Sequence, residues 1–299
     1  MVNNRDLIKG NYDLVLNPWW VTGIVDSEGN FFITLQDTKC TAAFKVTQKD
    51  HSIGILFDLQ RYFNCGRVVI DNEKTRGWKY TVTDMKSMYN IIIPHFEKYS
   101  LITSKNLDFV DFKFVVGMCF KGQHKSQEAI EKIKNIKANM NSLRSFEQRW
   151  HYLNDIKSFK LENEWVQAFI DGEGSFQFEL NRNRNSYIAN ANLEIAQSSH
   201  DARVLQYIQN FFDSGYIKPK YDITCFEDAK IVRSVNRYVI QQSSKVVEFI
   251  DKYPLLTRKS LDYQDWKKLI ELKKNKAHLT ESGRAEIYFI KNNMNKSRI

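Results

Sequence analysis

The sequence predicts an α+β protein made of two related halves, each with a mainly antiparallel sheet. One observation is a short motif that occurs twice, as "DSEGNFFITL" at residues 26–35 and "DGEGSFQFEL" at residues 171–180. The other is that further matched segments follow each copy in the same order and at a nearly constant separation. A repeat of this length predicts two copies of one domain rather than a single large one.

Four pairs of segments define the repeat beyond the motif. The first two pairs are 149 residues apart and the last two are 154 apart: "FKVTQKD" (44–50) with "LEIAQSSHD" (193–201), "YFNCGRV" (62–68) with "FFDSGYI" (211–217), "YSLITSKNLDF" (99–109) with "YPLLTRKSLDY" (253–263), and "HKSQEAIEKIKNIKANMN" (124–141) with "HLTESGRAEIYFIKNNMN" (278–295). We therefore expect an N-terminal half-domain over residues 1–144, a connector over 145–161 and a C-terminal half-domain over 162–299.

The chain between Asn17 and Gly29 predicts a buried helix. Residues 18–25 are nearly all apolar, Asn17 offers a side-chain oxygen as N-cap, and Pro18 suits the first helical position. Gly29 is expected to adopt the left-handed conformation that commonly ends a helix. Residues 165–170 repeat the apolar pattern before the second motif.

The remaining elements follow from periodicity and end signals. Strands are expected near residues 30–35, 42–48, 66–71 and 78–83, and near 175–180, 187–197, 216–222 and 231–241. Helices are expected near residues 50–63, 85–98, 126–140, 201–212 and 280–294, with Ser126 and Thr280 as N-caps. The connector lacks Gly and Pro and carries aromatic residues, which indicates an ordered segment packed on the surface.

Composition indicates an intracellular protein with a polyanionic partner. The net charge is +9, and both halves are basic, with 20 Lys and Arg against 15 Asp and Glu through residue 144 and 24 against 20 after it. Four scattered cysteines without a CxxC pair argue against a zinc site or a disulfide scaffold. No window is long and apolar enough for a membrane span, and the start resembles neither a signal peptide nor a transit sequence.

Glu28 and Glu173 end the two predicted motif helices, where the helix dipole is already negative and each charge is unfavourable alone. Related domains in one chain commonly pack about a pseudo-twofold axis, and the apolar motif helices are candidates for it. The matched small residues Gly23 and Ala168 would let these helices approach closely. We therefore expect the two carboxylates and nearby free carbonyls to form a hard-oxygen site for Mg²⁺ or Ca²⁺.

The segments "VTGIVDSEG" (21–29) and "VQAFIDGEG" (166–174) resemble the two signature motifs of the LAGLIDADG homing endonucleases, in the single-chain form with two motifs. The resemblance covers nearly all of the chain. It implies a saddle of two α+β half-domains that acts as a monomer with internal pseudo-twofold symmetry and cleaves both strands of duplex DNA. The sequence departs from the family at residues 22–23 and 167–168, where Ala-Gly is typical, which affects helix packing more than chemistry.

The resemblance also implies roles for matched residues. The metal-binding acid of each motif falls on Glu28 and Glu173, and the carbonyls of Ser27 and Gly172 join the coordination. Mg²⁺ is the expected cofactor, with Ca²⁺ able to occupy the sites without supporting cleavage. No organic cofactor is implied.

Three matched pairs surround those acids. Gln48 and Gln197 resemble residues that position water, and Lys105 and Lys259 resemble residues that stabilise the transition-state phosphate or the leaving group. The alternative interpretation is that the glutamines are solvated strand residues and the lysines ordinary residues at helix starts. The third pair, Asp26 and Asp171, matches the earlier aspartate of the two motifs, and we expect a structural role for it.

Base recognition should come from the strands, because a β-ribbon fits the major groove and alternate side chains reach base edges. Some of these residues will contact only phosphate. The candidates are Asn30, Thr34, Gln36, Lys45, Arg67, Lys79, Ser175, Gln177, Glu179, Asn181, Arg182, Arg184, Lys218, Lys220, Arg233 and Arg237. Because the halves are not identical, the DNA target need not be palindromic.

Two acids that meet on the pseudo-twofold axis must attack phosphates that lie close together on opposite strands. Such phosphates approach each other across the minor groove and are offset toward the 3′ ends, so short 3′ overhangs are expected, as the resemblance also implies.

Two other functions stay open at this point. The same fold serves as an intron maturase, which would make folded intron RNA a partner, and a non-catalytic DNA-binding regulator is the second alternative. Richness in Lys, Asn, Ile, Phe and Tyr favours an AT-rich genome. This composition is compatible with a mitochondrion or, as the alternative, a chloroplast.

Overall fold

The computed structural model describes residues 14–155, 159–184, 186–218 and 235–295. The chain forms two compact units, Met1–Ala168 and Phe169–Ile299. The division falls inside helix α9 (Asn163–Glu173), because the first turns of α9 pack on the first unit.

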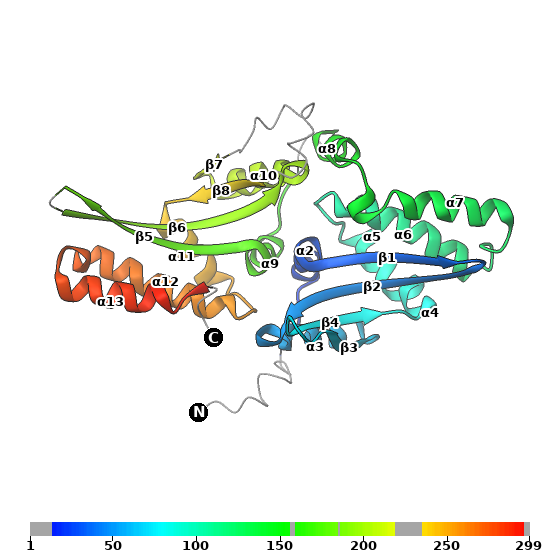
Figure 1. Ribbon diagram of the computed structural model, residues 1–299, viewed down its shortest axis with the longest axis horizontal. Helices are drawn as coiled ribbons and strands as arrows, with labels where there is room; N and C mark the ends of the chain where they lie inside the picture. Colours follow the sequence, from blue (N-terminus) through cyan, green and yellow to red (C-terminus); the bar gives the residue numbers. More distant parts are fainter. Residues whose placement is uncertain (1–13, 156–158, 185, 219–234, 296–299) are drawn as a thin grey trace. The chain divides into compact units, whose positions relative to one another are not determined.

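The first unit is an α+β domain with one antiparallel sheet (Figure 1). Its strands pair in the order β1-β2-β4-β3, so the strand that follows the first motif lies at a sheet edge. Along the chain the elements are α2 (Pro18–Glu28), β1 (Gly29–Gln36), β2 (Lys39–Lys49), a 3₁₀ turn (Asp50–Ser52), α3 (Gly54–Phe63), β3 (Arg67–Asn72), β4 (Gly77–Val82), α4 (Met85–Ser87), a π turn (Met88–Ile92), α5 (Ile93–Lys98), α6 (Lys105–Phe120), α7 (Gln127–Ala138), a 3₁₀ turn (Asn141–Leu143) and α8 (Phe146–Asp155).

The second unit repeats this plan with strand order β5-β6-β8-β7, again all antiparallel. Its elements are the end of α9, β5 (Gly174–Asn183), β6 (Ser186–Ser198), a 3₁₀ turn (Ser199–Asp201), α10 (Ala202–Phe212), β7 (Tyr216–Lys218), β8 (Val235–Ile240), α11 (Ser243–Lys252), α12 (Lys259–Lys274), a 3₁₀ turn (Ala277–Leu279) and α13 (Glu281–Asn292). The predicted strand segments 219–222 and 231–234 lie outside the described residues. The α+β fold class and the repeat are thus confirmed.

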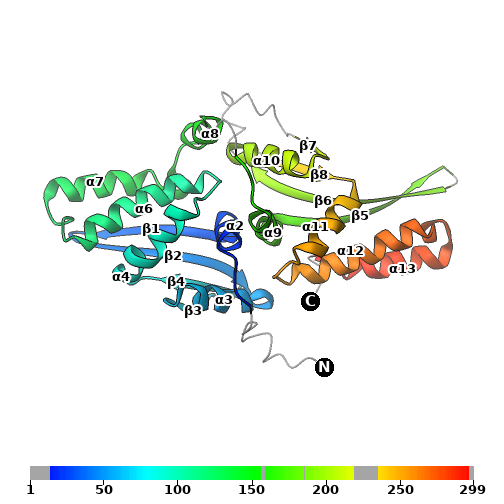
Figure 2. The ribbon, with the colours of Figure 1, turned by 180° about the vertical axis from the view of Figure 1, so that it is seen from behind.

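In each unit two helices run side by side along the sheet, α6 with α7 and α12 with α13 (Figures 1 and 2). We call α7 and α13 the closing helices. Their predicted N-caps are confirmed, since Ser126 Oγ accepts a hydrogen bond from Ala129 N and Thr280 Oγ1 accepts one from Gly283 N, both at 3.1 Å. No helix was predicted over α8 or α11, and for α6 and α12 the sequence indicated only possible helix starts at Lys105 and Lys259. In α6, Phe112 and Val116 are buried but Val110 and Phe114 are 52% and 39% exposed, which blurs the helical periodicity.

The predicted helix 85–98 is interrupted by a π turn over Met88–Ile92. Pro94 follows that turn and lacks the N–H that a continuous helix would use, so the wider turn accommodates the missing hydrogen bond.

Each core is aromatic. In the first unit the buried Phe31 ring lies 5.3 Å from Phe44 and 5.1 Å from Phe112, measured between ring centroids. In the second unit Phe176 takes the place of Phe31 and lies 5.3 Å from the buried Trp266 ring. These rings fix the motif strand of each unit against the helices.

An asparagine with positive φ follows each closing helix and ties it to the motif strand. Asn141 (φ 54°) donates from its backbone N to Asp108 and from its side chain to the Phe31 carbonyl, at 2.9 and 3.0 Å. Asn295 (φ 55°) makes the same two hydrogen bonds, to Asp262 and to the Phe176 carbonyl. Asparagine tolerates this left-handed conformation better than most residues.

Candidate active site at the ends of the motif helices

The first motif helix begins and ends as the residue types require. Asn17 Oδ1 accepts a hydrogen bond from Trp19 N at 2.8 Å, and Pro18 occupies the first turn, as predicted. Glu28 is the last residue of α2, where backbone carbonyls lack partners within the helix. The motif therefore delivers a carboxylate to a helix end rich in oxygen.

The prediction that Gly29 adopts a left-handed conformation is wrong. Its φ is −83° and its ψ is 159°, so the chain passes directly from helix into strand β1. Glycine is needed for space instead, because a Cβ would lie 2.5 Å from Val25 Cγ1 and 2.7 Å from the Val25 carbonyl oxygen. Gly174 meets the same restriction, with Ile170 O at 2.7 Å.

Asp26 is a buried acceptor that fixes the motif helix to the start of α6. Its oxygens accept from Ile102 N at 2.9 Å, from Thr103 N and Oγ1 at 3.1 and 2.7 Å, and from Trp165 Nε1 at 2.8 Å. Burial raises the pKa of Asp26, while the hydrogen bonds and the Lys105 charge act in the opposite direction. These contacts agree with the structural role expected for this residue.

Lys105 is the first residue of α6 and returns to the motif helix. Its Nζ lies 2.8 Å from the Val25 carbonyl oxygen and 3.4 Å from that of Ser27. The ammonium group therefore occupies the carbonyl-rich helix end that also carries Glu28. This placement distinguishes Lys105 from an ordinary solvated lysine at a helix start.

The second unit builds the same arrangement. Asp171 accepts from Leu256 N and from Thr257 N and Oγ1, and burial likewise raises its pKa. Lys259 Nζ lies 2.9 Å from the Gly172 carbonyl oxygen and 2.5 Å from that of Gly174. Lys259 thus reaches carbonyls two positions later along its motif than those that Lys105 reaches.

The predicted water-positioning glutamines lie at the sheet end nearest each motif acid. Gly29 pairs with Val46, so Gln48 on β2 lies two residues beyond the start of β1. Gly174 pairs with Ile195, which places Gln197 at the corresponding point of β6. Both glutamines are partly exposed and share the strand face that otherwise carries buried residues.

One face of the first sheet carries the predicted DNA-contacting residues, and we call it the open face. Register places Asn30 opposite Lys45, Thr34 opposite Thr41, and Gln36 opposite Lys39, all alternating with buried residues. Arg67 and Lys79 continue this face through β3 and β4. Lys39 belongs to the same face and was missed, although strand alternation alone would have identified it.

Two cations of the open face already have partners. Lys79 Nζ forms an ion pair with Asp71 at 2.9 Å, and the hydrogen bond from Lys79 lowers the pKa of Asp71. Lys45 Nζ lies 4.4 Å from the centroid of the Phe32 ring. Both groups are therefore held in place on the sheet before any ligand binds.

In the second unit Ser175, Gln177, Glu179 and Asn181 alternate along the open face of β5. Lys218 and Arg237 are cross-strand partners on β7 and β8. Two predicted contacts do not share this face. Arg182, the cross-strand partner of Tyr187, lies on the opposite face of β5, and Arg184 (φ 50°) lies beyond the end of β5. The predicted contacts Lys220 and Arg233 lie outside the described residues.

The β5–β6 hairpin is longer than its counterpart. Between matched pairs the chain runs from Gly29 to Val46 in the first unit and from Gly174 to Ile195 in the second. The insertion of four residues lengthens each strand by two. Arg284 of α13 supports the extension, because its guanidinium lies 4.3 Å from the centroid of the Tyr187 ring.

The donor set fits a hard divalent metal. Each motif helix ends in one carboxylate beside backbone carbonyl oxygens. In the described ranges no three His, Cys, Asp or Glu side chains gather into a metal cluster. Each carbonyl has two lone pairs, so a carbonyl that accepts from a lysine keeps a position for another ligand.

The described ranges of the chain contain no helix that is long and apolar enough to cross a membrane.

Comparisons with known proteins agree with this arrangement. The family model described as LAGLIDADG endonuclease matches residues 21–116 and 168–270. "Probable intron-encoded endonuclease 2" of Neurospora crassa is 30% identical over 93% of this chain, and "Uncharacterized mitochondrial protein RF1" of Saccharomyces cerevisiae is 23% identical over 99%. The chain spans 65% and 63% of the lengths of these two relatives.

Among solved structures, the meganuclease I-SmaMI bound to uncleavable DNA has a TM-score of 0.82 and 26% identity, covering 97% of this chain and 100% of that chain. The same meganuclease bound to an uncleaved DNA target in the presence of calcium ions has a TM-score of 0.81 and 26% identity, covering 94% and 100%. Because the family model matches both halves and the solved fold extends over nearly the whole chain, this chain belongs to the LAGLIDADG endonuclease family.

Proposed function

We propose that this chain is a site-specific homing endonuclease that cleaves both strands of a long, non-palindromic DNA duplex with a divalent metal. The observation that carries the proposal is the duplicated helix end, where Glu28 with Lys105 and Glu173 with Lys259 stand in equivalent positions. The two DNA-bound structures of I-SmaMI support DNA as the substrate.

Glu28 and Glu173, with the carbonyls of Ser27 and Gly172, would hold the metal. Mg²⁺ is the proposed cofactor, and Ca²⁺ would occupy the same ligands without supporting cleavage, as the calcium-containing complex of I-SmaMI with uncleaved DNA suggests. A divalent metal supplies an activated water and stabilises the negative charge that develops on the phosphate.

The chain's own side chains supply the remaining functions. Lys105 and Lys259 bring a positive charge to each helix end and would stabilise the phosphate or the leaving oxygen. Gln48 and Gln197, at the nearby sheet ends, would position water. Asp26 and Asp171 hold each motif helix against the residues that precede the lysine.

The open faces would bind the major groove, and their differences favour an asymmetric target. The half-buried Phe32 lies on the first open face, where the matched position of the second carries the half-buried amide side chain of Gln177. Aromatic and aliphatic groups contact thymine methyl groups, whereas amides form hydrogen bonds with adenine. The two half-sites should therefore differ in sequence.

The test begins with selection of cleaved sites from a randomised DNA library in Mg²⁺. End-labelled duplexes of the selected site, run beside a sequencing ladder, should show short 3′ overhangs, because phosphates of opposite strands approach across the minor groove with a 3′ offset. Blunt ends or 5′ overhangs would refute the proposed attack across the minor groove. Ca²⁺ in place of Mg²⁺ should permit binding without product.

Replacement of either motif acid by glutamine tests the assignment of the acids. Glu28→Gln and Glu173→Gln keep the side-chain shape but remove the charge that binds the metal, so double-strand cleavage should fall at least about a hundredfold. DNA binding in Ca²⁺-free buffer should be retained. Two variants that cleave at nearly the original rate would exclude these residues as the metal-binding acids.

We further propose a mitochondrial site of action, which the mitochondrial relative of yeast supports. Fractionation of cells that express the natural gene would test it. A protein that leaves DNA intact but accelerates splicing of a folded intron RNA would instead be a maturase.

A further inference from the structure

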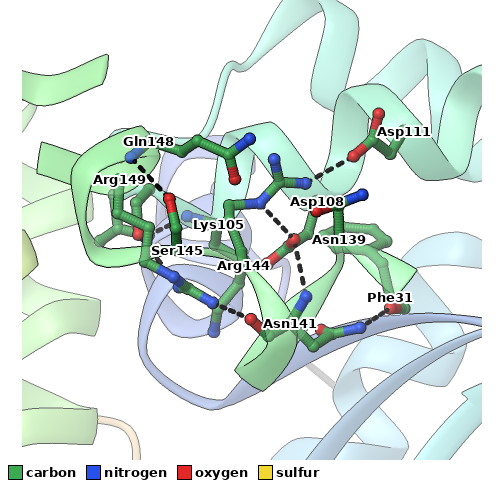
Figure 3. A network of polar contacts seen from close by, with 12 residues as sticks. Phe31, Lys105, Asp108, Asp111, Asn139, Asn141, Arg144, Ser145, Gln148 and Arg149 are labelled. Atoms are coloured by element: carbon green, nitrogen blue, oxygen red, sulfur yellow. Dashed lines mark hydrogen bonds and ion pairs between the residues drawn. The ribbon is translucent and has the colours of Figure 1, made fainter. Parts of the chain in front are cut away.

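The connector helix α8 contacts both residues that flank Lys105. Arg149 Nη1 donates to Ser104 Oγ at 3.2 Å, and Asn106 Nδ2 donates to the Tyr152 hydroxyl at 2.8 Å. Figure 3 shows Arg149 and Lys105 within one polar network. The connector is therefore joined to the first turn of α6 on both sides of the candidate lysine.

Ser104 precedes α6 at the position where a serine commonly caps a helix, but its side chain makes no capping hydrogen bond. Its fully buried hydroxyl accepts from Arg149 instead, and Lys105 N donates to Thr103 Oγ1 at 3.3 Å. The backbone at Lys105 is thus held from one side by Thr103, which is bound to Asp26, and from the other side by α8.

The residue that precedes the connector anchors it close to Arg149. Arg144, whose side chain is 7% exposed, pairs with Asp108 at 3.0 Å and with Asp111 at 2.5 Å. Arg149 Nη2 also donates to the Asn141 carbonyl oxygen (Figure 3). Arg149 therefore joins the turn that follows α7 to the start of α6, and its planar, multiply bonded guanidinium suits a fixed distance between them.

The second half does not repeat these residue types. Arg258 and Ser260 flank Lys259, where Ser104 and Asn106 flank Lys105. Both lysines reach the matched carbonyls of Ser27 and Gly172, but Lys105 also reaches that of Val25 whereas Lys259 also reaches that of Gly174. The two residue types that bind α8 in the first half are thus absent from the matched positions beside Lys259.

We propose that Arg149 and Tyr152 are positioning residues for Lys105. Through Ser104 and Asn106 they fix the first turn of α6 and hence the reach of the Lys105 ammonium group toward the end of α2. This inference rests on the proposed role of Lys105 in cleavage. Because each motif acid has its own lysine, the connector controls the cleavage of one DNA strand and leaves the other strand to Lys259.

The test is single-turnover cleavage of the selected duplex in Mg²⁺, with each strand labelled separately. Lys105→Met identifies the strand that depends on this lysine. Arg149→Lys and Tyr152→Phe should slow the same strand by about tenfold, because a small misplacement of a catalytic group costs one to two powers of ten in rate. The other strand should keep its rate, so nicked duplex should accumulate, and the Kd for DNA in Ca²⁺ should not change.

Gln148→Ala is the matched control, since Gln148 lies on the same helix and, within the described residues, its side chain makes no hydrogen bond, its backbone N alone reaching Ser145 Oγ. It should cleave both strands at the original rates. Thermal unfolding identifies any variant that is poorly folded. If Arg149→Lys is unstable, Tyr152→Phe, which loses only one hydroxyl, carries the test of the positioning role alone.

The outcomes separate the inference from the proposed function. If Lys105→Met slows one strand while the two connector variants slow neither strand, or slow both equally, the positioning role is overturned and the role of Lys105 stands. If Lys105→Met slows neither strand, the role of Lys105 is overturned together with the inference, whereas cleavage that depends on Glu28 and Glu173 stands. Strand-selective slowing by both connector variants supports the inference.

Discussion

His95 is a buried histidine whose surroundings keep it neutral. Its Nε2 lies 3.4 Å from Thr22 Oγ1 and its Nδ1 lies 3.2 Å from the Tyr62 hydroxyl, and the Tyr99 ring packs beside it. Burial lowers the pKa of His95 to about 4. Since Thr22 belongs to the motif helix, protonation of His95 would disturb the support of that helix.

This pKa predicts how stability depends on pH. Between the ordinary pKa of 6.5 and the folded value of about 4, the unfolded chain binds more protons, so the His95 contribution is complete above pH 6.5 and is lost as the pH falls. Burial raises the pKa of Asp58 to about 6, which acts in the opposite direction from pH 3.8 to 6. The Asp58 contribution cancels when the original chain and the His95→Gln variant are compared by denaturant unfolding at each pH. The unfolding free energy of the original chain minus that of the variant should fall by about 3 kcal/mol from pH 7 to pH 4. A difference that does not vary with pH would contradict a neutral His95.

At this scale the sequence identifies residues that repeat and misses residues that do not. The shared position of Glu28 and Lys105 at one helix end, and of Glu173 and Lys259 at the other, could be predicted because each residue occurs twice in the same order. The hydrogen bond from Trp165 to Asp26 joins residues 139 positions apart and has no sequence signal. Arg149 was missed for the same reason, because its proposed role depends on the residues against which α8 packs, Ser104 and Asn141.

At the scale of elements, the close contact at Gly23 predicts a measurable cost. A Cβ there would lie 2.6 Å from the Trp165 carbonyl oxygen and 2.8 Å from Ala168 Cβ, and backbone atoms cannot move aside as a flexible side chain can. Gly23→Ala should therefore destabilise the protein by about 1–3 kcal/mol in denaturant unfolding.

Gly117→Ala is the control for this prediction, because the nearest atom to its added Cβ is 4.0 Å away and alanine favours a helix. That variant should be neutral or more stable by up to about 1 kcal/mol. Equal effects of the two substitutions would show that helix propensity, and not close packing, decides both.

Elements with one clean periodicity could be predicted, and those with two competing features could not. The strands alternate between buried and exposed residues, which made their faces readable in advance. The turn after α2 was misread because glycine serves both conformation and space, and only the fold shows that Val25 leaves no room for a Cβ. The π turn before Pro94 likewise required knowledge of the packing.

At the scale of the whole molecule, charge predicts the binding behaviour. The net charge is +9, and the open faces carry Lys39, Lys45, Arg67 and Arg237 among the described residues. If about six of the cations contact phosphates, affinity should fall by about a thousandfold between about 50 and 200 mM salt through counterion release. Fluorescence anisotropy with a labelled duplex would measure the slope, and a flat response would contradict phosphate contacts.

One chain contains both motifs, so cleavage should not require association. The rate per molecule in single-turnover reactions should be independent of protein concentration, and the sedimentation mass should equal one chain. A rate that rises with the square of concentration would indicate that two chains assemble before cutting.

The four-residue insertion in the β5–β6 hairpin predicts an asymmetric footprint on a DNA duplex bound as proposed. Two additional residues per strand extend the hairpin by about 7 Å at about 3.4 Å per residue, which is the rise of about two base pairs. Arg284 of α13 contacts that extension, with its guanidinium 4.3 Å from the centroid of the Tyr187 ring. The hydroxyl-radical footprint should therefore be asymmetric. Protection should extend about two base pairs farther from the cleavage site on the side bound by the C-terminal half than on the other side. Shortening the hairpin should retract that edge alone.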